Sequence, residues 1–218
     1  MKDNIQKLIY FLVIIIVVCA LTFFVNKDLY GQIIVEDGVV EYGTAFLLLM
    51  CSVLFVVKVF RLKADRSLLW AVFNLFLALG LFFGFGEEIS WGQRIFSVEA
   101  GEFFKENNLQ GETNLHNLKI NGVKINKWIF SYAISLIFGV YFLILPFLYP
   151  KQLKIKKLID LLGVPVPKVK QSILFLVASL IIFIVPDSKK WELWECLFGL
   201  VFLLIILNPF NSEEDFIE

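Results

Sequence analysis

Histidine and cysteine are scarce in this sequence. One histidine, His116, and three cysteines, Cys19, Cys51 and Cys196, occur among 218 residues. A structural zinc site needs several Cys or His ligands, usually at short spacings. The composition therefore excludes such a site, and the odd number of widely separated cysteines gives no disulfide framework. We expect the cysteines to be small buried hydrophobic residues.

Excess charge of either sign is also lacking. Twenty basic and 20 acidic residues cancel to a formal net charge of zero. No phosphate-binding glycine loop, serine nucleophile motif, internal repeat or low-complexity tract is visible. Without a basic patch, we expect no nucleic-acid partner.

Apolar residues, by contrast, are abundant. The hydrophobic fraction is 59%, phenylalanine alone occupies 24 positions, and the mean hydropathy is +0.79. Runs of about 20 apolar residues can cross roughly 30 Å of hydrocarbon, and there they must be helical. The sequence predicts an all-α membrane protein, a single polytopic domain over 1–218 with about six transmembrane helices. The expected helices are approximately 8–25, 39–60, 68–86, 128–149, 171–186 and 191–207, with a long, partly structured outer loop between the third and the fourth.

The distribution of lysine and arginine predicts the orientation. The amino end, the segment 58–66 and the segment 151–170 carry 2, 4 and 6 basic residues, against 1, 5 and 2 in the alternate segments. The segment with 5 is long and counts less under the positive-inside rule. We therefore expect a multi-pass protein of the cell (inner) membrane with both termini cytoplasmic. The first apolar run is too long for a signal peptide and has no A-x-A-like cleavage site, so it is expected to be a retained anchor. The lysine-rich segment 151–170 is expected to lie along the anionic inner leaflet, although it could be a topology signal alone.

Acidic residues gather on the opposite face. Of 20 acidic residues, 13 fall outside the membrane or at the outer ends of helices in this topology. Three helix pairs thus bring carboxylates to one membrane face at similar depth. Those closest to the apolar runs are Glu36, Asp37, Glu41, Glu87, Glu88, Asp187, Glu192 and Glu195.

Helical spacing refines the prediction for Glu87 and Glu88. If the third helix continues past Gly86, one polar stripe is formed by Glu87, Ser90, Trp91 and Arg94. The spacing then allows Glu87 or Ser90 to meet Arg94. Glu88 lies about 100° further round and is expected to point into the bundle, toward the acids that open the second and sixth helices. Carboxylates that meet in a low-dielectric pocket require a proton or a cation.

A simpler interpretation is that these acids are solvated helix ends. Acids at helix amino termini are favoured by the helix dipole, which accounts for much of Glu41, Glu192 and Glu195. It does not account for Glu87 and Glu88, which close a helix.

The outer loop, about 95–127, carries His116 among several hydrogen-bonding residues. Structureless loops of this length are unusual unless functional or disordered, so we expect part of it to pack back as a short amphipathic or re-entrant piece. His116 could be an ordinary surface histidine. It lies on the face where the acids gather, and it is expected to approach Glu41, Glu88, Glu192 or Glu195.

Three stretches carry a resemblance. "GEEISWGQRIF" at 86–96 followed by "NLQGETNLHN" at 108–117, together with "EDGVVEY" at 36–42, resembles a group of uncharacterised bacterial multi-pass membrane proteins. The resemblance implies that these stretches form one unit, and it implies no particular chemistry. Glu87, Glu88 and Arg94 are also weakly similar to the EExxxR motif of intramembrane CAAX-type proteases. Arg94 comes two positions late, however, and the two further histidine motifs of those proteases are absent.

Three functions remain open. The favoured hypothesis is a membrane-embedded hydrolase or group transferase acting on a lipid or lipid-linked substrate. Carboxylates would act as acid and base, and His116 would act as a proton shuttle or ligand. The alternatives are a transporter or ion-coupled membrane protein, and a non-catalytic structural or partner-binding membrane subunit. The candidate catalytic residues are Glu41, Glu87, Glu88, Arg94, His116 and Glu195. A divalent metal is possible, with candidate ligands Glu41, Glu88, His116, Glu192 and Glu195. The sequence indicates no oligomeric state.

Overall fold

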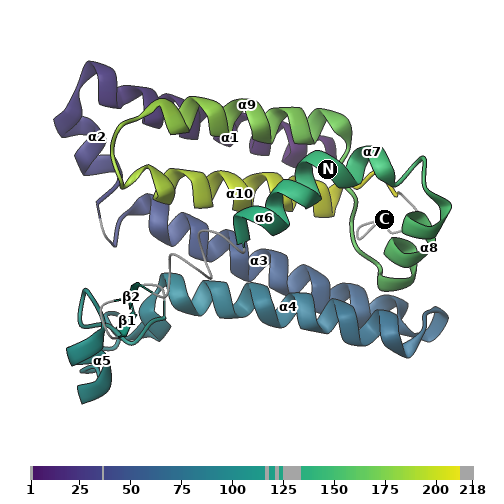
Figure 1. The fold of residues 1–218 in the computed structure, drawn as a ribbon, viewed down its shortest axis with the longest axis horizontal. Helices are drawn as coiled ribbons and strands as arrows, with labels where there is room; N and C mark the ends of the chain where they lie inside the picture. Colours follow the sequence, from purple (N-terminus) through teal and green to yellow (C-terminus); the bar gives the residue numbers. More distant parts are fainter. Residues whose placement is uncertain (1, 36, 116–117, 121–122, 125–133, 212–218) are drawn as a thin grey trace.

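The computed structural model describes the chain except for residues 1, 36, 116–117, 121–122, 125–133 and 212–218. The described part is predominantly helical, and its long helices run side by side along one axis (Figure 1). Three helical segments in it are long and apolar enough to cross a membrane: Lys2–Val25, Val39–Asp65 and Leu68–Glu88. These helices indicate a membrane protein, as the composition predicts.

Two helices form the amino-terminal arm. The first, α1, spans Lys2–Val25, close to the predicted run. A short second helix that the sequence did not predict, α2 (Lys27–Ile33), follows at once. Asn26 separates them, and its side chain accepts a hydrogen bond from the backbone N–H of Leu29 at 3.0 Å. Such a cap satisfies an otherwise unpaired amide and starts the new helix in a different direction.

An antiparallel pair of long helices comes next. Helix α3 (Val39–Leu62) leads through a 3₁₀ turn, η1 (Lys63–Asp65), into α4 (Leu68–Glu88). Ser67 caps α4 by accepting from the amide of Trp70. The two helices are joined midway by Ser52, whose hydroxyl donates to the carbonyl of Ala78 at 2.7 Å. A hydrogen bond of this kind satisfies a buried hydroxyl where water is absent.

Short elements follow α4. The 3₁₀ turn η2 (Ser90–Gly92) comes first, and the predicted outer loop then contains helix α5 (Glu102–Asn107) and the antiparallel strands β1 (Lys119–Ile120) and β2 (Val123–Lys124). Helix α5 fits the expectation that part of the loop is structured. The described residues of this loop therefore form a folded unit attached to the end of α4 (Figure 1).

The predicted fourth helix is interrupted. Residues 128–133 lie outside the described part, and the rest forms α6 (Ile134–Gly139), a π-helical turn η4 (Val140–Ile144) and α7 (Leu145–Leu148). In the π turn the amide of Leu145 donates to the carbonyl of Val140, five residues earlier. Pro146 has no amide hydrogen, so the regular ladder cannot continue through it. The prediction of a continuous helix over 128–149 is therefore only partly correct.

The last three helices complete the core. Helix α8 (Leu153–Leu162) lies within the segment predicted as a lysine-rich loop, and α9 (Val169–Ile184) and α10 (Lys190–Leu207) follow. Helix α10 packs against α1, α3 and α9 and carries much of the buried apolar surface. Gly199 permits the close approach of α3, because a Cβ there would lie 3.0 Å from the Cβ of Leu47.

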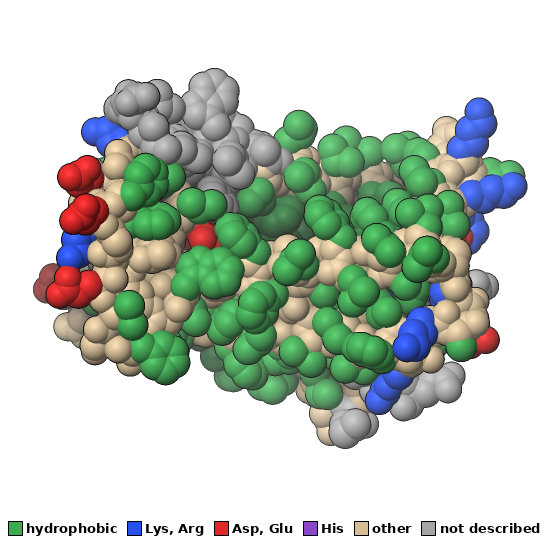
Figure 2. Space-filling view, turned by 90° about the horizontal axis from the view of Figure 1, so that it is seen from below, with side chains coloured by type: hydrophobic (Ala, Val, Ile, Leu, Met, Phe, Trp, Pro, Cys, Tyr) green, Lys and Arg blue, Asp and Glu red, His purple; other side chains and the backbone are tan. Residues whose placement is uncertain are grey.

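The outer surface of the bundle is apolar. Figure 2 shows a broad hydrophobic band between an end where acidic side chains gather and an opposite end where most of the visible lysines and arginines gather. Large side chains on α1, α4 and α9 are half-exposed or more, among them Phe11, Phe76 and Leu180. A surface of this kind suits a lipid environment.

Candidate functional site

The carboxyl end of α4 turns sharply. The helix ends at Glu88, and Ser90 and Trp91 then adopt left-handed backbone conformations with φ of 46° and 55°. Non-glycine residues rarely adopt such angles, and they persist where surrounding contacts hold them. The expectation that the helix continues and aligns Glu87, Ser90 and Arg94 on one helical stripe is therefore wrong. Tertiary hydrogen bonds to the outer loop outweigh the helical preference of this segment.

Trp91 folds back over α4. A Cβ at Gly86 would lie 2.8 Å from the indole ring, so glycine is required for this packing. The indole nitrogen donates to Oε1 of Glu87 at 2.9 Å, and the amide of Leu115 donates to Oε2 at 2.6 Å. Glu87 is thus buried and bridges α4 to the outer loop. Its role in the structure is to hold this loop.

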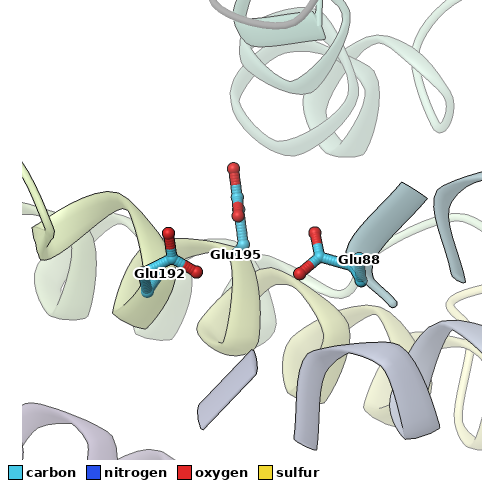
Figure 3. Close-up of side chains that lie close together, drawn as sticks. All are labelled: Glu88, Glu192 and Glu195. Carbon is cyan, nitrogen blue, oxygen red and sulfur yellow. The ribbon is translucent and has the colours of Figure 1, made fainter. Parts of the chain in front are cut away.

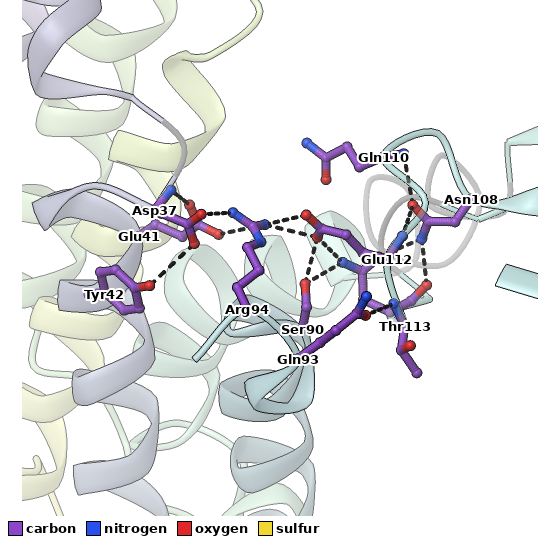
Figure 4. Close-up of polar contacts among 11 residues, drawn as sticks. Asp37, Glu41, Tyr42, Ser90, Gln93, Arg94, Asn108, Gln110, Glu112 and Thr113 are labelled. Atoms are coloured by element: carbon purple, nitrogen blue, oxygen red, sulfur yellow. Dashed lines mark hydrogen bonds and ion pairs between the residues drawn. The ribbon is translucent and has the colours of Figure 1, made fainter. Parts of the chain in front are cut away.

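The carboxylate of Glu112 accepts hydrogen bonds from polar side chains of the segment that follows α4. Ser90 Oγ donates to Glu112 Oε2 at 2.6 Å, and Asn114 Nδ2 donates to the same oxygen at 3.0 Å. Arg94 Nη2 lies 2.8 Å from both carboxylate oxygens. Arg94 and Ser90 therefore share a carboxylate, which is that of Glu112 in the loop and not that of Glu87 (Figure 4).

Arg94 also reaches α3. Its Nη1 pairs with Asp37, and its Nη2 lies 3.8 Å from Glu41. Burial acts to lower the pKa of Arg94, but hydrogen bonds and the charges of Asp37 and Glu112 outweigh burial and raise it above its usual value. The guanidinium is therefore a permanent cation that joins the start of α3 to the loop.

The loop supports this arrangement with its own hydrogen bonds. Asn108 Oδ1 accepts from the amides of Gln110 and Glu112, and Asn108 Nδ2 donates to Asn114. Gln93 Oε1 accepts from the amide of Thr113 at 2.6 Å. Asn108 and Asn114 are buried. The loop around Glu112 is consequently a rigid clamp on the end of α4 (Figure 4).

A second cluster lies inside the bundle. Glu88 at the end of α4 meets Glu192 and Glu195 at the start of α10, and one carboxylate oxygen from each residue lies within 4.8 Å of the others. All three side chains are half-buried, and Glu195 lies between Glu192 and Glu88 (Figure 3). Glu192 and Glu195 can face the same partner because they are three residues apart on one helix. The structure thus places Glu88 toward the acids of the last helix, as the 100° offset from Glu87 suggested.

The spacing of these oxygens suits one divalent cation. Two ligands on opposite sides of Ca²⁺, at about 2.3–2.6 Å each, are separated by about 4.6–5.2 Å, and for Mg²⁺ by about 4.2 Å. Carboxylate oxygens are the donors that Mg²⁺, Mn²⁺ and Ca²⁺ prefer. Three ionised carboxylates this close repel one another unless a cation or protons intervene. Glu88, Glu192 and Glu195 could therefore hold a hard divalent ion.

The predicted candidates divide between the two clusters. Glu41 lies between them, because it approaches Arg94 and also acts electrostatically on Glu88 and Glu195. Glu87 and Arg94 belong to the loop clamp and not to the carboxylate cluster. Glu36 and His116 lie outside the described residues, so the expected approach of His116 to the carboxylates stays a prediction.

Glu112 was missed as a site residue. In sequence it is one acid in a polar loop, 18 residues from Arg94. The available signal was its place in "NLQGETN", where an asparagine, a glycine and a second asparagine favour a tight turn. Such a turn is able to fix a carboxylate in the loop opposite the single arginine that follows α4.

Comparisons with known proteins give no relative: no family model, curated protein or solved structure matches this chain.

Proposed function

We propose that the protein is a multi-pass membrane protein with about six transmembrane helices and an outward-facing site that binds a divalent cation. The site would serve hydrolysis or group transfer on a lipid or lipid-linked substrate. The observation that carries this proposal is the convergence of Glu88, Glu192 and Glu195 from two helices within 4.8 Å. Half-buried carboxylates are costly to gather without a ligand, and intramembrane acids commonly mark functional sites.

The proposed chemistry follows from the donors. A divalent cation at these oxygens would polarise a carbonyl or phosphoryl oxygen and favour ionisation of a bound water. In hydrolysis, the water oxygen would form the new bond to the carbonyl carbon or phosphorus while the bond to the leaving oxygen breaks. Glu41, next to the cluster, would take the proton from the water and deliver it to the leaving oxygen. Arg94, which is itself held by Glu112, would hold Glu41 in place from the side opposite the carboxylate cluster.

The substrate class follows from the position of the cluster. It lies where α4 ends and α10 begins, and acidic side chains gather at one end of the hydrophobic band (Figure 2). A lipid or lipid-linked molecule can present its polar group at that depth while its chains remain in the bilayer. A water-soluble substrate would have no comparable reason to meet a site within the bundle.

The test is cation binding by the purified full chain in detergent. Titration with Ca²⁺, Mg²⁺ and Mn²⁺ should show one site by calorimetry and a rise in melting temperature. Glu88→Gln and Glu195→Gln should each weaken binding at least about tenfold, because each removes one of three charged ligands. Glu102→Gln is the matched control, since Glu102 is exposed on α5 and outside the cluster. If no cation binds to the wild type, or Glu102→Gln weakens binding equally, the metal proposal fails. Proton uptake without cation binding would favour the transporter hypothesis instead.

The proposed orientation has its own test. Both termini are placed in the cytoplasm, so reporter fusions at Lys63 and Lys156 should read as cytoplasmic and one at Asn108 as external. The reverse pattern would move the carboxylate cluster to the inner face and overturn the outer-leaflet assignment.

A further inference from the structure

Helix α8 presents a surface that the carboxylate site does not use. It spans Leu153–Leu162 and lies at the end of the bundle away from the acids (Figure 1). Lys154, Lys157, Leu158 and Leu161 recur at helical spacing and share one face, and all four are exposed. A face that carries both lysines and leucines suits the boundary between lipid headgroups and acyl chains.

The opposite face of α8 is fixed to the protein. Helix α8 packs on α4, and Ile155, Ile159 and Leu162 are only partly exposed. The carbonyl of Leu162 accepts from Asn74 Nδ2 at 2.9 Å, and the carbonyl of Gly163 accepts from Lys58 Nζ at 2.7 Å. The helix is thus held in one orientation, with its lysine–leucine face turned away from the bundle.

The lysines of this face are available for an external anion. The one acid of α8, Asp160, already accepts from Lys156 at 3.0 Å and from the hydroxyl of Tyr149 at 2.6 Å. Among the described residues, no ion pair or hydrogen bond engages the side chains of Lys154 and Lys157. Within the part of the chain that the structure describes, the charge of this face is therefore positive.

We propose that α8 is a binding surface for anionic phospholipid headgroups. Lys154 and Lys157 would contact the phosphates, and Leu158 and Leu161 would enter the upper acyl region, as long amphipathic side chains do at interfaces. Charge complementarity selects an anionic lipid over a zwitterionic one. This proposal requires that the bundle lies in a membrane, and it is independent of cation binding at Glu88.

The test uses the purified full chain in neutral detergent. Phosphatidylglycerol and phosphatidylcholine are titrated separately, and the bound lipids are counted by native mass spectrometry. The wild type should prefer phosphatidylglycerol. Lys154→Gln combined with Lys157→Gln should lower that preference about 30-fold, at about fivefold for each lysine near an anionic surface. Replacing both by Arg should preserve it.

The controls separate this surface from general charge. Lys119→Gln combined with Lys189→Gln removes the same charge from exposed positions at the acidic end. That variant should bind phosphatidylglycerol as the wild type does, and raising the salt from about 0.15 M to about 0.5 M should weaken the preference of both. Equal melting temperatures in phosphatidylcholine alone establish that all variants are folded. If the α8 variant keeps the preference, if the control variant loses it equally, or if millimolar inorganic phosphate displaces the lipid, the proposal is overturned.

Discussion

Arg94 is the residue whose loss should affect the loop clamp most. Arg94→Ala removes the cation shared by Asp37, Glu41 and Glu112, while the remaining hydrogen bonds from Ser90 to Glu112 stay in place. We expect the outer loop to detach from the start of α3 without unfolding the helices.

The size of the effect follows from burial. Breaking a fully buried ion pair costs about 3–5 kcal/mol, because a charge remains without compensation. The Glu112 side chain is 13% exposed and keeps its neutral donors, so the loss should be smaller, about 2–3 kcal/mol. For a chain of roughly 200 residues this corresponds to a melting temperature lower by about 4–12 °C.

Hydrogen exchange and melting together provide the assay. The amides of Glu112, Thr113 and Leu115 all donate to side chains of this region, so they should exchange faster in Arg94→Ala. The amides of α10 should keep their protection, because the core does not include the clamp.

A matched ion pair in the same loop provides the control. Lys105 pairs with Glu99 at 2.6 Å, but their side chains are 50% and 85% exposed. Exposed pairs contribute little to stability, so Lys105→Ala should leave melting unchanged. If Arg94→Ala melts like Lys105→Ala and the exchange of the loop is unaltered, the reasoning about the buried clamp is refuted.

Two further predictions concern the opposite end of the molecule. Gly163→Ala should destabilise the protein by at least about 1 kcal/mol more than Gly111→Ala. Both glycines have φ of +69°, but a Cβ at Gly163 would lie 2.1 Å from the indole nitrogen of Trp70, whereas nothing lies within 4 Å of one at Gly111; equal melting temperatures would contradict the steric argument. Burial and the hydrogen bond to Asp160 raise the pKa of Tyr149, so its contribution to stability is present below about pH 10 and is lost as the pH rises through the raised pKa. In melts from pH 8 to 11.5, Tyr149→Phe should therefore be less stable than wild type at the low end and approach it at the high end, and a constant difference would count against this assignment.

Much of the helical framework could be predicted from sequence because hydrophobic length is a local property. The spans Lys2–Val25, Val39–Leu62 and Leu68–Glu88 begin and end within a few residues of the apolar runs, apart from the polar amino-terminal turn of α1. Helix α8 was missed because its alternation of lysine and leucine has low mean hydropathy, although its spacing is that of an amphipathic helix. The sequence signal for the interruption at η4 was Pro146, which lies inside the predicted run and cannot donate a backbone hydrogen bond.

The site could be predicted in part because the ends of the apolar helices can be located from local sequence. Acids at the end of one helix and the start of an antiparallel helix lie at the same face of the bundle, and Glu88, Glu192 and Glu195 meet there although α4 and α10 both pack chiefly on α3. The partner of Arg94 could not be predicted in this way. Glu112 reaches it through a left-handed turn at Ser90 and a folded loop, and both depend on contacts between segments distant in sequence.

Lys58 has a consequence for the order of assembly. Its buried ammonium donates to the carbonyl of Gly163, which lies 105 residues later in the chain. At synthesis rates of about 5–20 residues per second, that carbonyl emerges roughly 5–20 s after the lysine. During this interval the lysine, close to the carboxyl end of α3, must reach water or headgroups. The contact that buries it can form only after α4 and α8 have both been made. The packing of α3 around Lys58 is therefore completed only when α8 has been made.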